Sequence, residues 1–257
     1  MKKILAILIL ITLAACEHTS VRQHPSFANS WGKQYSVVMV PPESKITYVQ
    51  FDSDNRRLSE DEAKANNVIK SEVPKIFQDK GYKFINVNFE DYYAEYPNLK
   101  FDLEKLRTAS SEALDDMYKN PQLEPKVAFN FQKSVGPLAN IFADASGADL
   151  VLLINYEGFE KSDGMVAKDI AASVLVGVLT GMVPIQPTEA GGLEAILIDG
   201  SSGDILWTNV GATTYPLNKY DPSTAQESGL FVKTRAMTPL GVVFEALPDK
   251  TKSKAAD

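Results

Sequence analysis

The sequence predicts an α/β domain with a mixed sheet, helices on both faces and an antiparallel hairpin at one edge. Strand-like apolar runs alternate with stretches whose apolar residues recur at helical spacing. Residues 149–156 form an apolar run without polar alternation, which is typical of a strand covered on both faces. Residues 193–198 and 204–214 flank the turn sequence Gly-Ser-Ser-Gly, which indicates the hairpin.

Three further strands are expected before this central run. Residues 35–40 are apolar and β-branched, and Pro41 and Pro42 should end that strand abruptly. Residues 45–51 would extend the sheet, and residues 82–89 alternate like a half-buried strand.

Four helices are expected between and after the strands. The first begins with a capping box of Ser59 and Glu62 and continues to Gly81, with a kink at Pro74. The later helices are predicted over residues 102–117, with Asp102 as the cap, over residues 127–147, and between residues 223 and 247.

The first residues have the order of an export signal. Lys2 and Lys3 precede the apolar run 4–13, which has roughly half of the about 20 residues that a membrane-spanning helix needs. We therefore expect residues 1–15 to be a signal peptide that is removed.

Residues 13–16, Leu-Ala-Ala-Cys, resemble the bacterial lipobox. The resemblance implies that Cys16 is acylated and holds the protein on a membrane. Glu17 resembles the outer-membrane sorting pattern of enteric bacteria, so we expect the periplasmic face of the outer membrane. The alternative is a plain secreted protein in which Cys16 is incidental.

Four parts of the chain are expected. After the signal peptide of residues 1–15, residues 16–34 are polar and predict a lipidated, flexible tether. Residues 35–247 should form one periplasmic α/β domain, because no Pro/Gly/Ser-rich linker divides them, and residues 248–257 form a charged tail.

Composition excludes several function classes. The net charge of -7 becomes -9 when Lys2 and Lys3 are removed, and this acidic balance argues against nucleic acid and against docking on anionic lipid head groups. Both histidines, His18 and His24, lie in the expected tether, and Cys16 is the one cysteine. Nucleophilic sites and zinc sites that need a positioned histidine or cysteine are therefore not expected.

No catalytic, cofactor or metal site is predicted. The sequence has no G-x-x-x-x-G-K-[ST] loop and no G-x-G-x-x-G after a strand, the two glycine motifs that bind phosphates. The segment from Asp52 begins like a calcium-binding loop, but Arg56 and Arg57 occupy the positions that need an oxygen ligand and a glycine. The carboxylates of Glu90, Asp91, Asp115 and Asp116 are the remaining candidates for catalysis, but they suit a solvated surface better. Asp199 and Asp204 flank the hairpin turn, where aspartate is favoured for backbone bonding.

Three segments together resemble a broad group of envelope lipoproteins. They are Val-Val-Met-Val-Pro-Pro (37–42), Ala-Ser-Gly-Ala-Asp-Leu-Val-Leu-Leu-Ile (145–154) and Leu-Ile-Asp-Gly-Ser-Ser-Gly-Asp-Ile-Leu-Trp (197–207). The group includes the GNA-type lipoproteins of Neisseria, the penicillin-binding-protein activator lipoproteins, the curli-secretion lipoprotein and the amino-terminal domain of TolB. The resemblance covers residues 35–214 and implies fold and compartment rather than activity.

Two segments are candidate contact surfaces. Residues 170–185 carry no charge, and Ser173, Gly177 and Gly181 recur at a four-residue spacing that allows close backbone approach. Burial in the core, a protein interface and membrane insertion remain alternatives there. The second candidate contains Tyr92, Tyr93 and Tyr96, which would form a platform for a sugar or a partner, or else pack on their own core.

These observations predict a non-enzymatic accessory or assembly component of a cell-envelope complex. Its expected partners are the membrane, through Cys16, and envelope proteins or further copies of the chain. The first alternative is a subunit of an oligomeric export or secretion ring in the outer membrane. The second is a module that binds carbohydrate or peptidoglycan.

Overall fold

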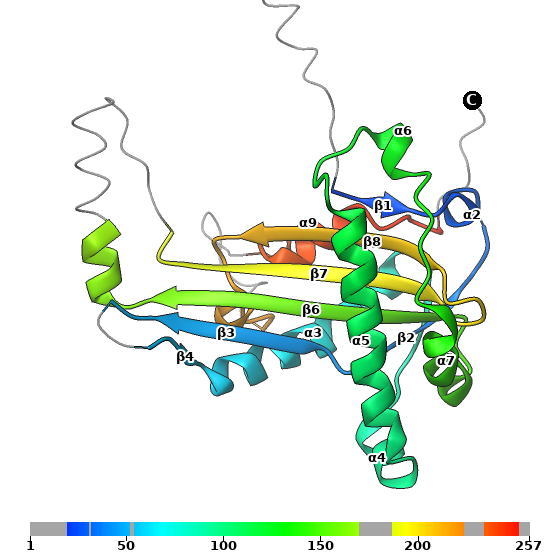
Figure 1. Cartoon of the computed structure of the whole chain (residues 1–257), viewed down its shortest axis with the longest axis horizontal. Helices are drawn as coiled ribbons and strands as arrows, with labels where there is room; N and C mark the ends of the chain where they lie inside the picture. The colour runs from blue at the N-terminus through cyan, green and yellow to red at the C-terminus, as the bar shows by residue number, and fades with distance from the viewer. Residues whose placement is uncertain (1–19, 31, 52–53, 170–186, 224–233, 252–257) are drawn as a thin grey trace, which may run out of the picture.

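One mixed sheet of eight strands is built around β6 (Leu150–Lys161), as Figure 1 shows. The structure is a computed structural model and describes residues 20–30, 32–51, 54–169, 187–223 and 234–251. The sheet runs in the order β1-β8-β7-β6-β2-β5, and β3 pairs with both β6 and β4. These residues form a single domain of the predicted α/β class.

Two parallel strands follow one another along the same side of β6. β2 (Ser36–Met39) pairs with its beginning and β3 (Glu43–Val49) with its later part. Met39 lies opposite Leu152, and Glu43 lies opposite Asn155. Between these two pairs the chain advances by four residues from β2 to β3 but by only three along β6. The extra residue is a bulge at the two prolines, which confirms that they end the first strand.

The outer strands complete both edges. β5 (Lys83–Ile85) is parallel to β2, and β4 (Arg56–Arg57) is antiparallel to β3. On the other side lie β7 (Glu189–Asp199), β8 (Ile205–Thr213) and β1 (Arg22–Gln23), each antiparallel to its neighbour. The predicted hairpin is confirmed as β7–β8, and β1 covers its outer edge.

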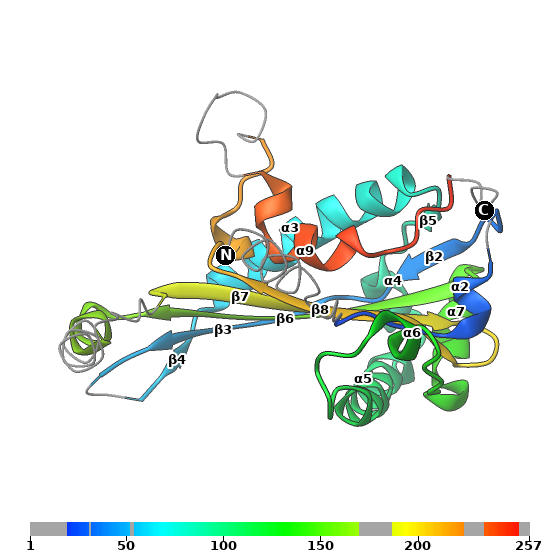
Figure 2. The same cartoon turned by 90° about the horizontal axis from the view of Figure 1, so that it is seen from above.

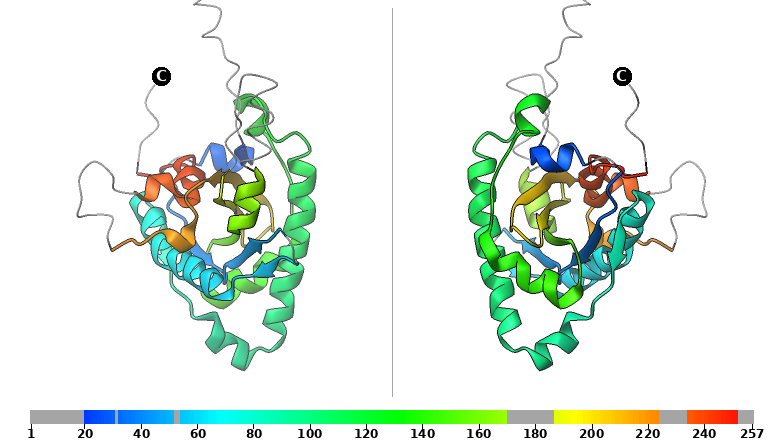
Figure 3. Two further views of the ribbon diagram at one scale, coloured as in Figure 1. Left: turned by 90° about the vertical axis from the view of Figure 1, so that its left-hand side faces the viewer. Right: turned by 90° about the vertical axis from the view of Figure 1, so that its right-hand side faces the viewer.

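Helices cover both faces, as Figures 2 and 3 show. α3 (Ser59–Asp79) and α9 (Pro239–Glu245) lie on one face, whereas α5 (Asn98–Met117) and α7 (Asn140–Ser146) lie on the other. α4 (Phe89–Glu95) packs into the core on the α5 side. Alternate residues of β6 enter two separate cores: Leu152 packs toward α3 and Val151 toward α5. This double burial explains the unbroken apolar run.

Shorter helices join these elements. They are α2 (Pro25–Ala28), α6 (Pro125–Ala128), η1 (Gly136–Ala139), η2 (Leu217–Lys219) and η3 (Arg235–Met237). The single helix expected over residues 127–147 is wrong. α6 ends at Ala128, residues 129–135 are not helical, and Gly136, which begins η1, has a left-handed φ of +66°.

The caps of two helices also differ from expectation. α3 begins at the predicted residue without the capping box, because the Glu62 carboxylate accepts from the amide of Ile46 at 3.0 Å instead. Pro74 lies inside α3, as predicted. α5 begins at Asn98, and Asp102 pairs with a lysine rather than capping the helix.

The N-terminal segment differs most from the prediction. Residues 20–30 were expected to belong to a flexible tether, but they pack on the sheet, with Arg22 and Phe27 fully buried. Part of the predicted tail, residues 248–251, also packs: the amide of Lys250 donates to the carbonyl of Lys80 at 2.8 Å. Cys16 and residues 170–185, with Ser173, Gly177 and Gly181, lie outside the described residues.

Candidate functional site

The sheet continues beyond the helices that cover its α5 face, where β3, β6 and β7 extend past α5 (Figure 1). On this face of β6, the buried side chains of Val151 and Leu153 are followed by Asn155 and Glu157. The face therefore changes from apolar and covered to polar and accessible. We call the resulting hollow the sheet-face cleft.

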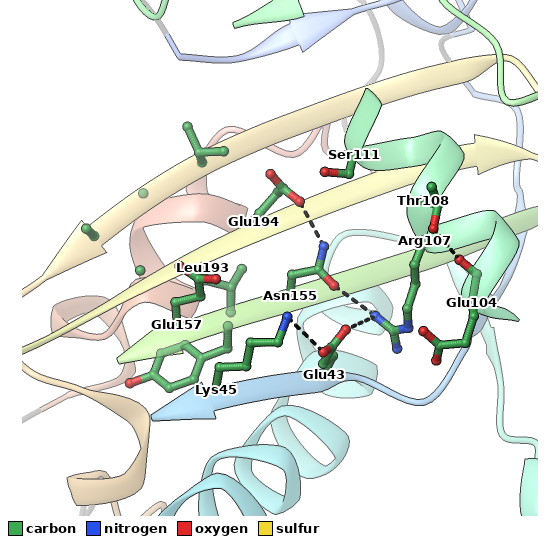
Figure 4. Close-up of a pocket in the computed structure, with 15 residues that line it drawn as sticks. Glu43, Lys45, Glu104, Arg107, Thr108, Ser111, Asn155, Glu157, Leu193 and Glu194 are labelled. Carbon is green, nitrogen blue, oxygen red and sulfur yellow. Dashed lines mark hydrogen bonds and ion pairs between the residues drawn. The ribbon is translucent and has the colours of Figure 1, made fainter. Parts of the chain in front are cut away.

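The sheet-face cleft has a volume of about 690 Å³ and lies between α5 and the open half of the sheet. Small residues of β7 and β8 form part of its floor, and charged residues of α5, β3, β6 and β7 surround them (Figure 4). The small residues are Gly192, Gly211 and Ala212; the charged ones are Glu43, Lys45, Glu104, Arg107, Glu157 and Glu194.

Arg107 holds α5 against the sheet at one end of the cleft. Its guanidinium donates to Oδ1 of Asn155 at 2.8 Å and to the carbonyl of Pro41, and it lies 3.5 Å from the carboxylate of Glu43 (Figure 4). Burial lowers the pKa of Arg107, while Glu43 opposes that shift. An arginine remains charged under such conditions, so the cleft keeps a fixed cation at its wall.

Glu194 extends the same network along the cleft floor. Nδ2 of Asn155 donates to its carboxylate at 2.9 Å, so Asn155 links Glu194 to Arg107. Burial raises the pKa of Glu194, and the bond from Asn155 partly offsets this effect.

The cleft is acidic overall. Its four carboxylates outnumber its lysine and arginine by two, which gives a formal charge of -2. Such a concave, partly preorganised surface suits a ligand or a protein segment that carries cationic or hydrogen-bond-donating groups.

The sheet-face cleft was not predicted from the sequence. A signal was present, because Asn155 and Glu157 interrupt one face of an otherwise apolar strand, but α5 had to be placed before that face could be recognised as open. Arg107 carried no distinguishing sequence signal.

The structure brings together two of the three predicted tyrosines. The rings of Tyr92 and Tyr96 stack with centroids 6.5 Å apart and line a pocket of about 630 Å³ with Asp102 and Asp144. Tyr93 does not line this pocket and packs half-buried against the α5-side core. We call this hollow the tyrosine pocket.

Three of the candidate carboxylates, those of Asp91, Asp116 and Asp199, have structural roles. Asp116 is paired with Lys119 and Lys133, whose hydrogen bonds lower its pKa to about 2. Asp91 accepts from the side-chain Nδ2 of Asn88 at 3.0 Å. Asp199 accepts from hairpin-turn groups, including the amide of Ser201 at 2.9 Å, as the sequence suggested. The side chain of Glu90 is not described.

His24, which was expected in the tether, is part of the domain. Its Nδ1 accepts from the amide of Ser26 at 3.2 Å and so caps α2. Across the described parts of the chain, no three His, Cys, Asp or Glu side chains gather to hold a metal ion. In the same parts, every helix is too short or too polar to cross a bilayer.

Comparisons with solved structures give several neighbours, two of which are described below. No family model matches the sequence, and no curated protein matches it significantly. The LpoB C-terminal domain from Salmonella enterica overlaps 71% of this chain and 85% of its own, with 15% identity and a TM-score of 0.26. Lipoprotein GNA1162 from Neisseria meningitidis overlaps 76% and 86%, with 11% identity and a TM-score of 0.29.

Both neighbours overlap much of the chain but superpose poorly. Their TM-scores are too low to support an inference about fold or function, so the α/β class rests on the sheet and helices themselves. The resemblance to the TolB and curli-secretion proteins stays a prediction.

Proposed function

We propose that this protein is a lipid-anchored, non-enzymatic accessory component of a cell-envelope complex, located on the periplasmic face of the outer membrane. Its sheet-face cleft would bind the partner protein. The lipobox at residues 13–16 supports the anchor. The observation that carries the binding role is the open, acidic cleft.

The construction of the cleft favours binding. Arg107 and Glu194 are tied through Asn155 into a network that joins α5, β6 and β7. Groups already held in place lose little side-chain freedom when a ligand arrives, which favours recognition. Glu157 is exposed beside this network and is available to a cationic segment of the partner.

The mass of the native particle tests this proposal. The full chain is extracted from its native membrane in mild detergent, and the mass and composition of its complex are measured for wild type, Glu157→Lys and Glu60→Lys. Glu60 is exposed on α3, on the other face of the sheet. Glu60→Lys changes the net charge by the same amount as Glu157→Lys and is therefore the control. We expect Glu157→Lys alone to lose the partner.

Other particle compositions would contradict the proposal. A bare wild-type monomer, or equal retention of the partner by both variants, would exclude binding through the cleft. A homo-oligomer that breaks up in Gly177→Leu would instead support the export-ring alternative.

The tyrosine pocket favours carbohydrate or peptidoglycan binding as a second candidate function. Stacked aromatic rings beside the carboxylates of Asp102 and Asp144 provide an apolar face and hydrogen-bond acceptors. Titration with soluble peptidoglycan fragments should show weaker binding by Tyr96→Ala than by Phe101→Ala. Phe101 is an exposed aromatic residue of α5 outside the pocket. Equal affinities would exclude this candidate.

A further inference from the structure

A loop at the edge of the sheet lies where the N-terminal segment enters the domain. This loop, residues 118–133, is fixed to that segment by buried contacts. The Tyr118 hydroxyl donates to the carbonyl of Ser20 at 2.8 Å. Arg22, which is 1% exposed, donates to the carbonyl of Asn120 at 2.6 Å and lies over the Tyr118 ring. The place of residues 118–133 relative to Ser20 is therefore set by the fold.

The middle of this loop projects beyond β1 and carries α6 outermost, as Figures 1 and 3 show. Its apolar side chains face solvent there: Val127 is 52% exposed and Phe129 is 37% exposed. The amide of Phe131 donates to the carbonyl of Gln23 at 3.1 Å and closes the far end of the loop. The exposed apolar tip thus rests on a fixed base.

The charge around this loop differs from that of the chain. The charged side chains of residues 116–133 are Lys119, Lys126, Lys133, Asp116 and Glu124. Three cations minus two anions give +1, whereas the whole chain carries -7. The acidic remainder is repelled by anionic head groups, but this segment is not. The overall charge argued against docking on such a surface, and the net repulsion behind that argument is absent at this segment.

Covalent geometry limits how far this loop can lie from the membrane anchor. Ser20 follows Cys16 by four residues, and four residues of fully extended chain reach at most about 14 Å. This step rests on the proposed function, because it requires acyl chains on Cys16. With that anchor in the bilayer, Ser20 and the loop bound to it must lie close to the membrane surface.

We propose that residues 118–133 form the bilayer-facing surface of the domain, with Val127 and Phe129 at the boundary between head groups and acyl chains. The acyl chains provide the affinity, and the loop provides the orientation. The β1–β8 edge of the sheet then lies nearest the membrane. The sheet-face cleft opens sideways, where an envelope protein can reach it.

Spin labels report this orientation directly. Because Cys16 is the one natural cysteine and is expected to be acylated, a cysteine introduced elsewhere is the only thiol to label. The full lipidated chain is prepared as Val127→Cys, Phe129→Cys and, as controls, Phe101→Cys and Phe51→Cys. Phe51 lies just after β3, on the side of β6 away from β1. All four positions are exposed and apolar. Each variant is reconstituted in vesicles of phosphatidylethanolamine and phosphatidylglycerol without any partner protein.

Accessibility to oxygen and to a water-soluble nickel complex is then measured. We expect the oxygen-to-nickel ratio at positions 127 and 129 to be severalfold higher than at positions 101 and 51. Equal ratios at all four positions, with Cys16 acylated by mass spectrometry, would overturn the membrane orientation and leave the proposed function intact. An unmodified Cys16 would overturn both proposals.

Discussion

Gly203, in the turn between β7 and β8, illustrates a residue whose identity is dictated by its surroundings. Its backbone φ is +77°, and an added Cβ would lie 1.8 Å from the carbonyl oxygen of Gly136. Gly147 has a similar φ of +67°, but an added Cβ would have no atom within 4 Å. Replacing Gly147 therefore tests the cost of the left-handed backbone alone, whereas replacing Gly203 adds the cost of steric overlap.

The first prediction uses this pair of glycines. Gly147→Ala should lower the free energy of unfolding by about 1–2 kcal/mol, the cost of a left-handed backbone. Gly203→Ala should cost about 1–3 kcal/mol more, because the backbone of Gly136 must move. Urea unfolding of both variants measures the difference. Equal losses would mean that the turn relaxes freely.

Glu62 is a second position at which a single side chain matters. Its carboxylate accepts from the amide of Ile46 at 3.0 Å and from Arg57 at 2.8 and 2.9 Å. Burial alone would raise the pKa of Glu62, but these bonds outweigh burial and lower it. A depressed folded-state pKa stabilises the fold above about pH 4.3, the unfolded value, and this stabilisation is lost as pH falls through the folded pKa.

Glu62→Gln should therefore be pH-sensitive. We expect it to lower the free energy of unfolding by about 1–2 kcal/mol near neutral pH, with a loss that shrinks as the pH falls through the folded pKa of Glu62. Urea unfolding at several pH values measures this, with the exposed Glu60→Gln as control. A loss that is independent of pH would contradict the assigned role of the carboxylate.

Contacts between elements explain how α5 is oriented over the sheet. Arg107 connects it to the β2–β3 bulge through Pro41 and to β6 through Asn155. The bulge is where β2 ends and β3 begins, so one side chain holds the helix at the point where the sheet changes its pairing. The open end of the sheet-face cleft depends on this attachment.

The third prediction concerns this attachment. Arg107→Met should lower the free energy of unfolding by about 2–4 kcal/mol, because it leaves buried acceptors without their donor. Lys105→Met, on the same helix but with an exposed ion pair to Asp102, should change it by no more than about 0.5 kcal/mol. Thermal and urea unfolding of both variants measure the contrast, and similar small effects would show that α5 packs without Arg107.

The whole domain includes the segment before β2. Phe27 is buried in the core on the α3 side, and β1 supplies the outer strand of the sheet. An unpaired sheet edge exposes backbone hydrogen-bonding groups and favours association between chains. The N-terminal segment thus protects the edge as well as contributing to the core.

The fourth prediction concerns deletion of the N-terminal segment before Tyr35. A chain that begins at Tyr35 should lose at least about 4 kcal/mol of unfolding free energy relative to one that begins at Ser20, since burial of Phe27 and the bonds of Arg22 are both lost. It should also associate through the uncovered edge of β8. Urea unfolding and sedimentation measure the two effects. Equal stability of both chains would restore the flexible-tether interpretation.

Local patterns predicted much of the sheet and less of the helical side. The run that became β6 and the turn at Gly203 were identified because apolar periodicity and turn chemistry act over a few residues. The segment after α5 was predicted as one long helix, because its apolar residues have helical spacing even though residues 129–135 are not helical and Gly136 has a left-handed backbone. Periodicity alone does not report such a bend.

The candidate sites divide in the same way. Tyr92 and Tyr96 were proposed from the clustering of aromatic residues, and the structure brings them into one pocket. Tyr93 packs against the α5-side core instead, because neighbouring positions on a helix face different directions. The sheet-face cleft could not be proposed, because its walls come from strands and a helix that are distant in the sequence.

The sequence by itself determined the alternation of strands and helices, the hairpin and the expectation of an acylated Cys16, because each depends on residues close together in the chain. The tertiary structure alone decided that residues 20–30 belong to the domain. Arg22 lies in a segment whose polar composition had predicted a tether. Its buried guanidinium donates a hydrogen bond to the carbonyl of Asn120, which is 98 positions away in the chain. Long-range contacts of this kind leave no periodic signal, so only folding reveals them.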